Sequence, residues 1–474
     1  MSKYVYLLSF MVLSLGLAAQ ETFFRVYDRP QDERAYNFIQ NGDQGYLILG
    51  KSSKYMSDGL LLRKVALDGT EIWEKHENVP VWGLANNICV DAEENIVLLM
   101  NERIDNVSHI VLKKLDQSGN ELSSTNIIAG GDATGIAETE DGYLITGSAP
   151  PLSGDSSLIA KVDKELNLLW EKHYYPTTMA SQRTTAYDAL AFGNHYYVLG
   201  YYYGSPGYGV DHKSYLMKID QKGNPIWTKN FDTHIQQYYG SLIASSGGHL
   251  VIHGSYTDPE VHSLFRSSII CLDEDGTILW ENEMAQDQRT LWGEDLVEAS
   301  DGGFISCGGM WKNQGPTDIY LRKINAKGEH LWLKVIDRTY RDYASQLLLD
   351  EKDYILCTGY SLGNERYPNF FMMKTDPDGN FQGVEEVSDN ASIKVFPNPV
   401  RGGWCRVELR DMMAAEKMAV ELIDLSGRVV YHLDYHWDGM SNACDLNLND
   451  LPSGFYTLQV KATSGVLSHK MVIP

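Results

Sequence analysis

A phrase that ends in tryptophan recurs along most of this chain, and the repetition constrains the fold more than any local feature does. It reads LLRKVALDGTEIW at residues 61–73 and YLRKINAKGEHLW at residues 320–332. With the lysine of the phrase as marker, seven copies lie 47 to 57 residues apart, at Lys64, Lys114, Lys161, Lys218, Cys271, Lys323 and Lys374. A repeat of this length predicts a supersecondary unit that buries its apolar face by stacking on its neighbours.

Each unit predicts four short β-strands. Upstream of the lysine phrase lies an apolar run that ends in glycine, as in GYLILG at residues 45–50 and GYLITG at residues 142–147. The D-G or K-G-N step inside the phrase supplies the residue of positive φ that a tight hairpin turn requires. Four-stranded units arranged around an axis form a β-propeller. The sequence therefore predicts an all-β chain whose main domain, residues 20–384, is a seven-bladed β-propeller.

A segment near the N-terminus predicts how the ring closes. TFFRVYDR at residues 22–29 aligns without gaps to LWLKVIDR at residues 331–338, the fourth strand of the sixth unit. The seventh unit has no tryptophan strand of its own after Asn380. We therefore expect Phe23 to Asp28 to complete the seventh blade.

The first residues predict export. Lys3 precedes an apolar run over residues 5–17, and Ala18 and Ala19 offer a cleavage point, so residues 1–19 are interpreted as a signal peptide. The run is shorter than the roughly 20 residues that cross a bilayer, and no later segment qualifies, so we expect no transmembrane segment.

Charge and cysteine spacing exclude several classes of partner. The chain has 63 acidic and 40 basic residues, a balance that disfavours nucleic acid and anionic membranes. Its cysteines form no cluster at metal spacing, and the acidic turns at residues 273–276 and 376–379 lack the later ligands of a calcium loop, so we expect no metal. Four of them lie in apolar strand-like runs, at Cys89, Cys271, Cys307 and Cys357. A disulfide between Cys405 and Cys444 is left open.

The repeated D-G-x-x-x-W phrase resembles the tryptophan-docking repeats of quinoprotein (PQQ-like) dehydrogenase propellers and their non-enzymatic relatives. Many of those dehydrogenases have adjacent cysteines in the active site, and this chain has no such pair. We therefore expect no cofactor, and interpret the tryptophans as packing between blades.

Ligand contacts are expected from two places. The aromatic residues Tyr201, Tyr202 and Tyr203 fall at the longest insertion between strands, where they could stack on a sugar or peptide or pack on themselves. Polar residues in the innermost strands could face the central channel. Of these, Asp188 and Asp295 are the ligand-binding candidates, with Asn86 and Glu294 in similar positions. No two of them form a recognisable catalytic set.

The periodicity ends after Asn380, and an acidic and polar linker is expected at residues 385–394. Residues 395–474 alternate strand-like runs with glycine turns, which predicts a small Ig-like β-sandwich. Its motifs are P-N-P, D-x-x-G-R, L-x-x-G-x-Y and a late lysine; the motif residues are Pro397, Asn398, Pro399, Gly427, Arg428, Leu451, Gly454, Tyr456 and Lys470.

These motifs, in this order, resemble the type A C-terminal sorting domain of the Bacteroidetes type IX secretion system over nearly the whole tail. The resemblance implies that the folded tail is recognised by the type IX secretion machinery after export through the inner membrane. A sortase-like step would then cleave near the linker and leave the propeller on the outer-membrane surface or in the medium.

For the propeller itself the sequence favours a non-catalytic binding or adhesion module for an extracellular glycan, peptide or surface protein. The chain has no nucleophile elbow, H-E-x-x-H motif or P-loop. The alternative is a secreted hydrolase or lyase that acts on polysaccharide or peptide with carboxylates of the propeller channel.

Overall fold

The computed structural model describes most of the chain beyond residue 21. The described ranges are 22–27, 32–42, 45–52, 59–77, 87–105, 107–149, 156–176, 183–203, 212–232, 237–258, 260–261, 264–284, 289–312, 317–336, 341–362, 368–381, 392–410, 417–424, 428–436, 443–449, 451–462 and 465–473. The expected signal peptide, Asn86, Gly427 and most of the expected linker lie outside these ranges, so the domain boundaries stay predictions.

Seven four-stranded antiparallel sheets form the blades. Blade 1 contains β2 (Glu33–Gln40), β3 (Tyr46–Ser52), β4 (Gly59–Val65) and β5 (Glu71–Glu77). Blade 2 contains β6 (Ile88–Val90), β7 (Ile96–Ile104), β8 (Val107–Leu115) and β9 (Glu121–Ala129). Blade 3 contains β10 (Asp132–Thr139), β11 (Gly142–Ala149), β12 (Ser156–Asp163) and β13 (Leu168–Tyr174). Blade 4 contains β14 (Arg183–Phe192), β15 (His195–Tyr203), β16 (His212–Asp220) and β17 (Pro225–Phe231).

The remaining blades follow the same order. Blade 5 contains β18 (Gln237–Ala244), β19 (Leu250–Thr257), β20 (Phe265–Leu272) and β21 (Ile278–Met284). Blade 6 contains β22 (Arg289–Glu298), β23 (Phe304–Lys312), β24 (Thr317–Ile324) and β25 (His330–Ile336). Blade 7 contains β26 (Asp342–Leu349), β27 (Ile355–Ser361), β28 (Asn369–Thr375) and, from the N-terminus, β1 (Phe23–Val26).

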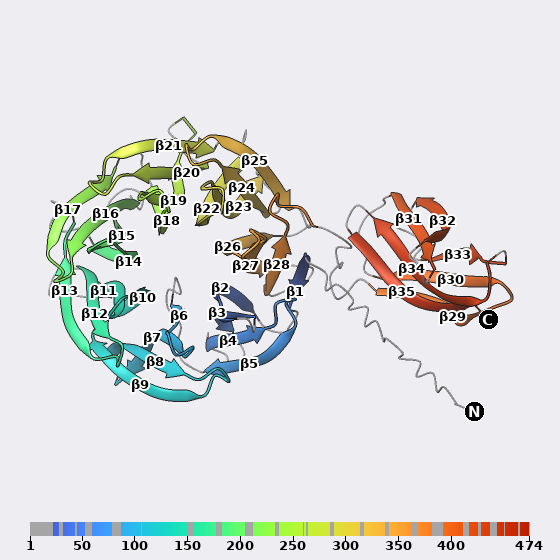
Figure 1. Cartoon of the computed structure of the whole chain (residues 1–474), viewed down its shortest axis with the longest axis horizontal. Helices are drawn as coiled ribbons and strands as arrows, with labels where there is room; N and C mark the ends of the chain where they lie inside the picture. The colour runs from blue at the N-terminus through green and yellow to red at the C-terminus, as the bar shows by residue number, and fades with distance from the viewer. Residues whose placement is uncertain are drawn as a thin grey trace, which may run out of the picture.

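The first strand of each blade lies nearest the axis and the fourth lies at the rim (Figure 1). The cores lie between blades, where the second and third strands bury nearly continuous apolar runs. Within the described ranges no α-helix occurs, so none there could cross a membrane. The all-β fold with seven propeller blades is confirmed.

The N-terminal strand closes the ring as predicted. In β1, Phe23 is opposite Lys374 and Val26 is opposite Phe371, so β1 is the fourth strand of blade 7. A Cβ added to Gly69 of blade 1 would come within 2.8 Å of the Phe23 ring, so this ring covers the turn of the next blade. Tyr27 Oη donates a 2.6 Å hydrogen bond to the Gly69 carbonyl across the same seam.

The five motif tryptophans make the same contact at the rim of five other seams. Each ring lies on the glycine of the next blade's turn; a Cβ on Gly223 would come within 3.0 Å of Trp170. That glycine has a φ of 75°, which favours glycine for a second reason. The other pairs are Trp73 on Gly119, Trp227 on Gly276, Trp280 on Gly328 and Trp332 on Gly379. The interpretation as packing between blades is confirmed.

The seam between blades 2 and 3 departs from this pattern. Ser123 stands in β9 where other blades have tryptophan, opposite Lys114 as Trp73 is opposite Lys64. Leu166 stands at the glycine position with a φ of 67°, although leucine is strained there. Its side chain is 1% exposed and belongs to the core that joins blades 2 and 3. The leucine therefore supplies the apolar surface that tryptophan supplies elsewhere.

In four repeats the marker lysine pairs with an aspartate of its own blade. Lys161 Nζ lies 2.8 Å from a carboxylate oxygen of Asp141, in the turn between the first two strands of its own blade. The same pairing joins Lys114 to Asp91, Lys323 to Asp301 and Lys374 to Asp350. The recurrent lysine is thus part of the blade's structure.

The C-terminal residues form two sheets. One has the order β29 (Ser392–Arg401), β30 (Trp404–Arg410) and β33 (Ala443–Asn447). The other has the order β32 (Val429–His436), β31 (Lys417–Ile423), β34 (Gly454–Ala462) and β35 (Gly465–Ile473). Both sheets contribute to one core that includes Val407, Leu422 and Leu458. The predicted β-sandwich is confirmed (Figure 1).

Candidate ligand site at the propeller axis

The innermost strands share a β-bulge near their middle. In six blades one residue is skipped in the pairing of the first strand with the second, as between Gly293 and Asp295. The corresponding residues of blade 2 lie outside the described ranges. We call the six skipped residues the axial ring: Tyr36, Thr134, Tyr187, Gly240, Glu294 and Ser345. Glu294 is exposed and the other five are partly exposed, so the bulge turns these residues towards the axis.

In blades 4 to 7 the residue after the bulge instead joins neighbouring blades. Asp188 Oδ2 accepts a 3.2 Å hydrogen bond from the backbone N–H of Leu242 in blade 5. Asp295 Oδ2 accepts a 2.8 Å hydrogen bond from the N–H of Leu347 in blade 7, and its Oδ1 accepts one from Ser241 in blade 5. Because successive residues of a strand point in different directions, one step along the chain separates the axial position from the inter-blade position.

The structure therefore gives Asp188 and Asp295, both expected to bind ligand, a place in the hydrogen bonding between blades. Their contact with a ligand stays a prediction. Glu294 was noted in the sequence as a polar residue in a similar position and was not chosen as a ligand-binding candidate. Its side chain has no hydrogen bond or ion pair to the described residues. A short sequence pattern separates the axial residue from the residue between blades. A small residue comes first, the axial residue second and a polar residue between blades third, as in Ala-Tyr-Asp at 186–188.

Glu294 is in an unusual electrostatic position. Water reaches its side chain, yet the blades enclose it on several sides, and this loss of hydration raises the pKa of its carboxyl to about 7. The negative charge of Asp295 raises it further. Gly240 lies between Glu294 and Tyr187: a Cβ there would lie 3.6 Å from the Tyr187 ring and 3.9 Å from the Glu294 carbonyl. The glycine leaves the space between the two side chains open.

Aromatic side chains continue from Tyr187 across blades 4 to 6. Ring centroids lie 6.2 Å apart between Tyr187 and Tyr201, and 4.9 Å apart between His212 and Tyr238. Phe265 stacks on Trp292 at 4.1 Å. We call this group the aromatic belt: Tyr187, Tyr201, His212, Tyr238, Phe265 and Trp292. All six are partly exposed, which makes them accessible to a ligand.

The structure separates the three tyrosines that were expected to act together. All three lie in β15 and not in the loop after it. Tyr201 belongs to the aromatic belt, whereas Tyr202 is 7% exposed and packs in the core between blades 3 and 4. The side chain of Tyr203 lies outside the described parts. Sequence inspection missed Tyr238, Phe265 and Trp292 because they come from three strands of two blades.

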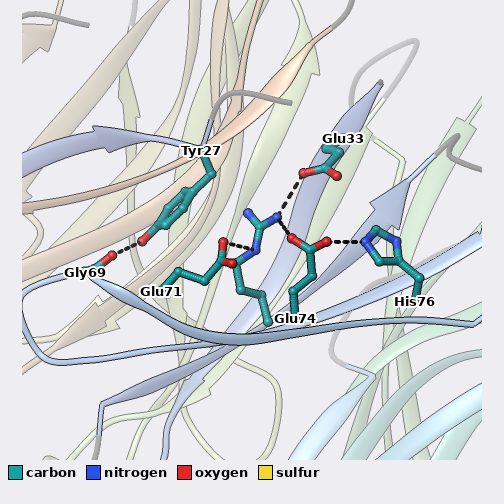
Figure 2. A network of polar contacts seen from close by, with 7 residues as sticks. Tyr27, Glu33, Gly69, Glu71, Glu74 and His76 are labelled. Carbon is teal, nitrogen blue, oxygen red and sulfur yellow. Dashed lines mark hydrogen bonds and ion pairs between the residues drawn. The ribbon is translucent and has the colours of Figure 1, made fainter. Parts of the chain in front are cut away.

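A second polar cluster lies at the seam between blades 7 and 1 (Figure 2). The Arg63 guanidinium is fully buried and pairs with Glu33 and Glu71 at 3.2 Å each and with Glu74. It also lies over the Phe370 ring of blade 7, 4.1 Å from the centroid. Burial acts to raise the pKa of Glu74, but hydrogen bonds from His76 and Arg63 outweigh it and lower the pKa to about 2.

Glu33, Glu74 and His76 are of types that bind metal ions, and their ligand atoms lie within 4.8 Å of one another. Arg63, however, already supplies a positive charge between Glu33 and Glu74, so an added metal ion would face electrostatic repulsion. The cluster is therefore explained as a buried ion-pair network that fixes blade 1 against the closing blade.

Several expected sorting residues meet at the C-terminal strand β35. Asn398, flanked by Pro397 and Pro399 in β29, accepts a 3.0 Å hydrogen bond at its side-chain oxygen from the N–H of Val472. Gly454 is opposite Ile473, and Tyr456, which donates to the Pro452 carbonyl at 2.7 Å, is opposite Met471.

The remaining sorting residues and the two cysteines lie elsewhere in the sandwich. Arg428 is exposed and pairs with Asp424 at 3.3 Å. Lys470 is opposite Thr457 in β35, with its side chain outside the described parts. Cys405 and Cys444 are buried free thiols on neighbouring strands, two positions out of direct register.

Comparisons with known proteins distinguish the two domains. A comparison with curated protein sequences gave no significant match. Among solved structures, the β-propeller domain of the trilobed protease from Pyrococcus furiosus is 11% identical, covers 75% of this chain and 100% of that chain, and has a TM-score of 0.46. A protein of unknown function from Dyadobacter fermentans is 13% identical over 75% and 97% of the two chains, with a TM-score of 0.41. Likenesses at this level carry no argument about function.

The tail gives a more specific result. Residues 394–474 match the model of the secretion system C-terminal sorting domain family. This match agrees with the motifs and with the sandwich, and it implies interaction with the type IX secretion machinery. Residues 394–474 therefore form a secretion system C-terminal sorting domain, and the chain is exported by type IX secretion to the cell surface or the medium.

Proposed function

We propose that the exported propeller is a non-catalytic binding module that engages its extracellular ligand at the axis, between blades 4 and 6. The aromatic belt is the observation that carries this proposal. It is a set of partly exposed rings from three blades, and one of them, Tyr187, interacts electrostatically with the accessible carboxylate of Glu294. Aromatic faces next to a few polar groups are typical of sites that bind sugars and peptides.

The arrangement of carboxylates favours binding over hydrolysis. Glycoside hydrolysis generally needs two available carboxyl groups on either side of the scissile bond. Here Asp188 and Asp295 accept hydrogen bonds from neighbouring blades, which leaves Glu294 as the available carboxylate among these three.

The test is binding of the purified full chain to glycan and peptide arrays. The double substitution Tyr201→Ala with Tyr238→Ala should abolish a specific signal, because it removes two rings of the aromatic belt. Tyr175→Ala is the matched control, since Tyr175 is 53% exposed and outside the belt. A specific signal that the double variant retains would move the ligand site away from the axis.

The alternative, a secreted hydrolase or lyase, is favoured by one observation. A carboxyl whose pKa is raised to about 7 suits proton transfer at neutral pH. Turnover of a polysaccharide or peptide that Glu294→Gln abolishes would establish it. Absence of turnover by pure protein on the ligands that the arrays identify would exclude it for those ligands.

A further inference from the structure

We propose that the ligand presents a long basic side chain, lysine or arginine, of an extracellular peptide to Glu294 at the propeller axis. The proposal rests on the binding function proposed above and adds the chemical class of the ligand. It depends on the charge of the axial ring, on the aromatic belt and on the separation of Glu294 from the rings.

The axial ring, as far as the structure describes it, has one acidic side chain and no basic one. The side chains of the axial ring are two tyrosines, a threonine, a serine and Glu294, whose carboxylate is the ring's formal charge. Among the described residues, the groups that interact electrostatically with Glu294 come from five strands and include no basic group: Asp295 on β22, Cys307 on β23, Tyr320 on β24, Tyr187 on β14 and Tyr360 on β27. A cationic group would therefore compensate a charge that the described residues leave uncompensated.

A nearby cation is already engaged elsewhere. Arg34 lies two residues before Tyr36 in β2, and its guanidinium makes two hydrogen bonds to Asp32, at 3.2 and 3.3 Å. The same guanidinium lies over the Tyr360 ring, 5.1 Å from the centroid. This contact also shows that the axial region binds a guanidinium against an aromatic face within the chain.

The aromatic belt suits a cation with an apolar stem. Trp292 and Tyr238 each lie two residues before the axial ring residue of their own strand. A strand rises about 3.3 Å per residue, so Glu294 lies about 7 Å from Trp292 along β22. A cation at the end of a flexible apolar stem, as in lysine or arginine, can span this separation while the stem packs on the rings.

The rings of the aromatic belt add to the selectivity for lysine and arginine side chains. Tyrosine and tryptophan faces attract ammonium and guanidinium groups and pack against methylene stems. An amino group bound directly to a sugar ring has no comparable stem. The net charge of −23 also increases the encounter rate with basic partners, although it does not select among them.

The experiment measures binding of short peptides to the full chain by calorimetry at 150 mM salt. The probes are glycine-flanked peptides with one central lysine, arginine, acetyl-lysine or norleucine. We expect the lysine or arginine peptide to bind at least tenfold more tightly than the acetyl-lysine and norleucine peptides, which keep the stem and lack the charge. Glu294→Gln should remove this difference.

Glu165→Gln is the matched control, because Glu165 is exposed in a turn of blade 3 and the substitution changes the net charge equally. Equal affinity for charged and uncharged peptides, or a charge preference that Glu294→Gln retains, would overturn the proposal. Array binding that needs Tyr201 and Tyr238 but not Glu294 would overturn the basic-ligand proposal and leave the binding function standing. No binding on arrays or in calorimetry would overturn both.

Discussion

The rim and the axis of the propeller use repetition in opposite ways. At the rim, the same residue types recur at almost every seam, with an aromatic ring from one blade on a glycine of the next. At the axis, the backbone device recurs, because six innermost strands carry a bulge at the same place, but the side chains differ: two tyrosines, a threonine, a glycine, a glutamate and a serine.

The difference indicates where function has been placed on the scaffold. Each rim contact joins two equivalent blades, so the same pair of residue types is suitable at every seam. The recurrence of these residue types at the rim therefore indicates that they stabilise the fold. Side chains that vary on a constant backbone have no such common task. The variation at the axis therefore marks it as the place for a specific ligand, and each prediction below tests this division.

The largest expected effect is a loss of folding stability on substitution of Asp295, the residue next to the axial Glu294 that hydrogen-bonds to neighbouring blades. Asp295→Ala removes the acceptor for the Leu347 N–H and for Ser241, and leaves buried donors without partners. We expect it to lower the free energy of unfolding by about 3 kcal/mol. Asp295→Asn keeps one oxygen acceptor and should cost about 1 kcal/mol. Thermal and denaturant unfolding of the two variants would measure both values.

The neighbour Glu294 provides the contrast within one strand. Glu294→Ala removes a side chain with no hydrogen bond to the described residues, so it should not destabilise the propeller. Equal losses for Asp295→Ala and Glu294→Ala would show that the axial and inter-blade positions are not separate.

A smaller effect is expected when the tryptophan–glycine contact of the rim is introduced at the seam between blades 2 and 3, which lacks it. Ser123→Trp alone adds a ring that Leu166 prevents from docking, and Leu166→Gly alone removes a buried side chain. We expect the glycine substitution to cost about 2 kcal/mol, because lost burial exceeds the relief of positive φ. Combined, the two substitutions should recover at least about 1 kcal/mol through a new tryptophan–glycine contact.

A double-mutant cycle of unfolding free energies measures this coupling. Ser124→Trp with Leu166→Gly is the matched control, because residue 124 is the next position along β9 and points to the other face. Additive effects of Ser123→Trp and Leu166→Gly would show that rim contacts are not interchangeable between seams.

Much of the scaffold was predictable because repetition amplifies weak local signals. The seven lysine phrases predicted seven blades, and the alignment of residues 22–29 with residues 331–338 predicted the closing strand down to Phe23 in the place of Trp332. The C-terminal domain was predicted from the order of its motifs and not from repetition, and the family model matches it over residues 394–474.

The axial site was only partly predictable, for two physical reasons. A bulge shifts the register by one residue, so within the sequence of blade 6 alone Glu294 and Asp295 are equally plausible axial residues. The aromatic belt joins rings from β14, β15, β16, β18, β20 and β22, whose proximity depends on how blades pack. Tyr201 was identified as a candidate, whereas Trp292 carried no local signal.

The smallest expected effect is the loss of folding stability that the ionised carboxylate of Glu294 causes at high pH. The pKa of this carboxyl is about 7 in the folded chain, above its ordinary value of 4.5, so the folded state holds the proton more tightly. The stability that this proton contributes is present below about pH 4.5 and is lost as the pH rises through 7. Glu294→Gln should therefore match the wild type near pH 4.5 and be more stable at pH 8. Since water reaches the side chain and screens the charge, we expect a gain of at most about 1 kcal/mol.

Paired thermal unfolding at the two pH values measures the difference, with Glu165→Gln as the control that should show none. A variant less stable than the wild type at pH 8 would mean that the ionised Glu294 supports the fold, and would place it with the structural residues of the rim.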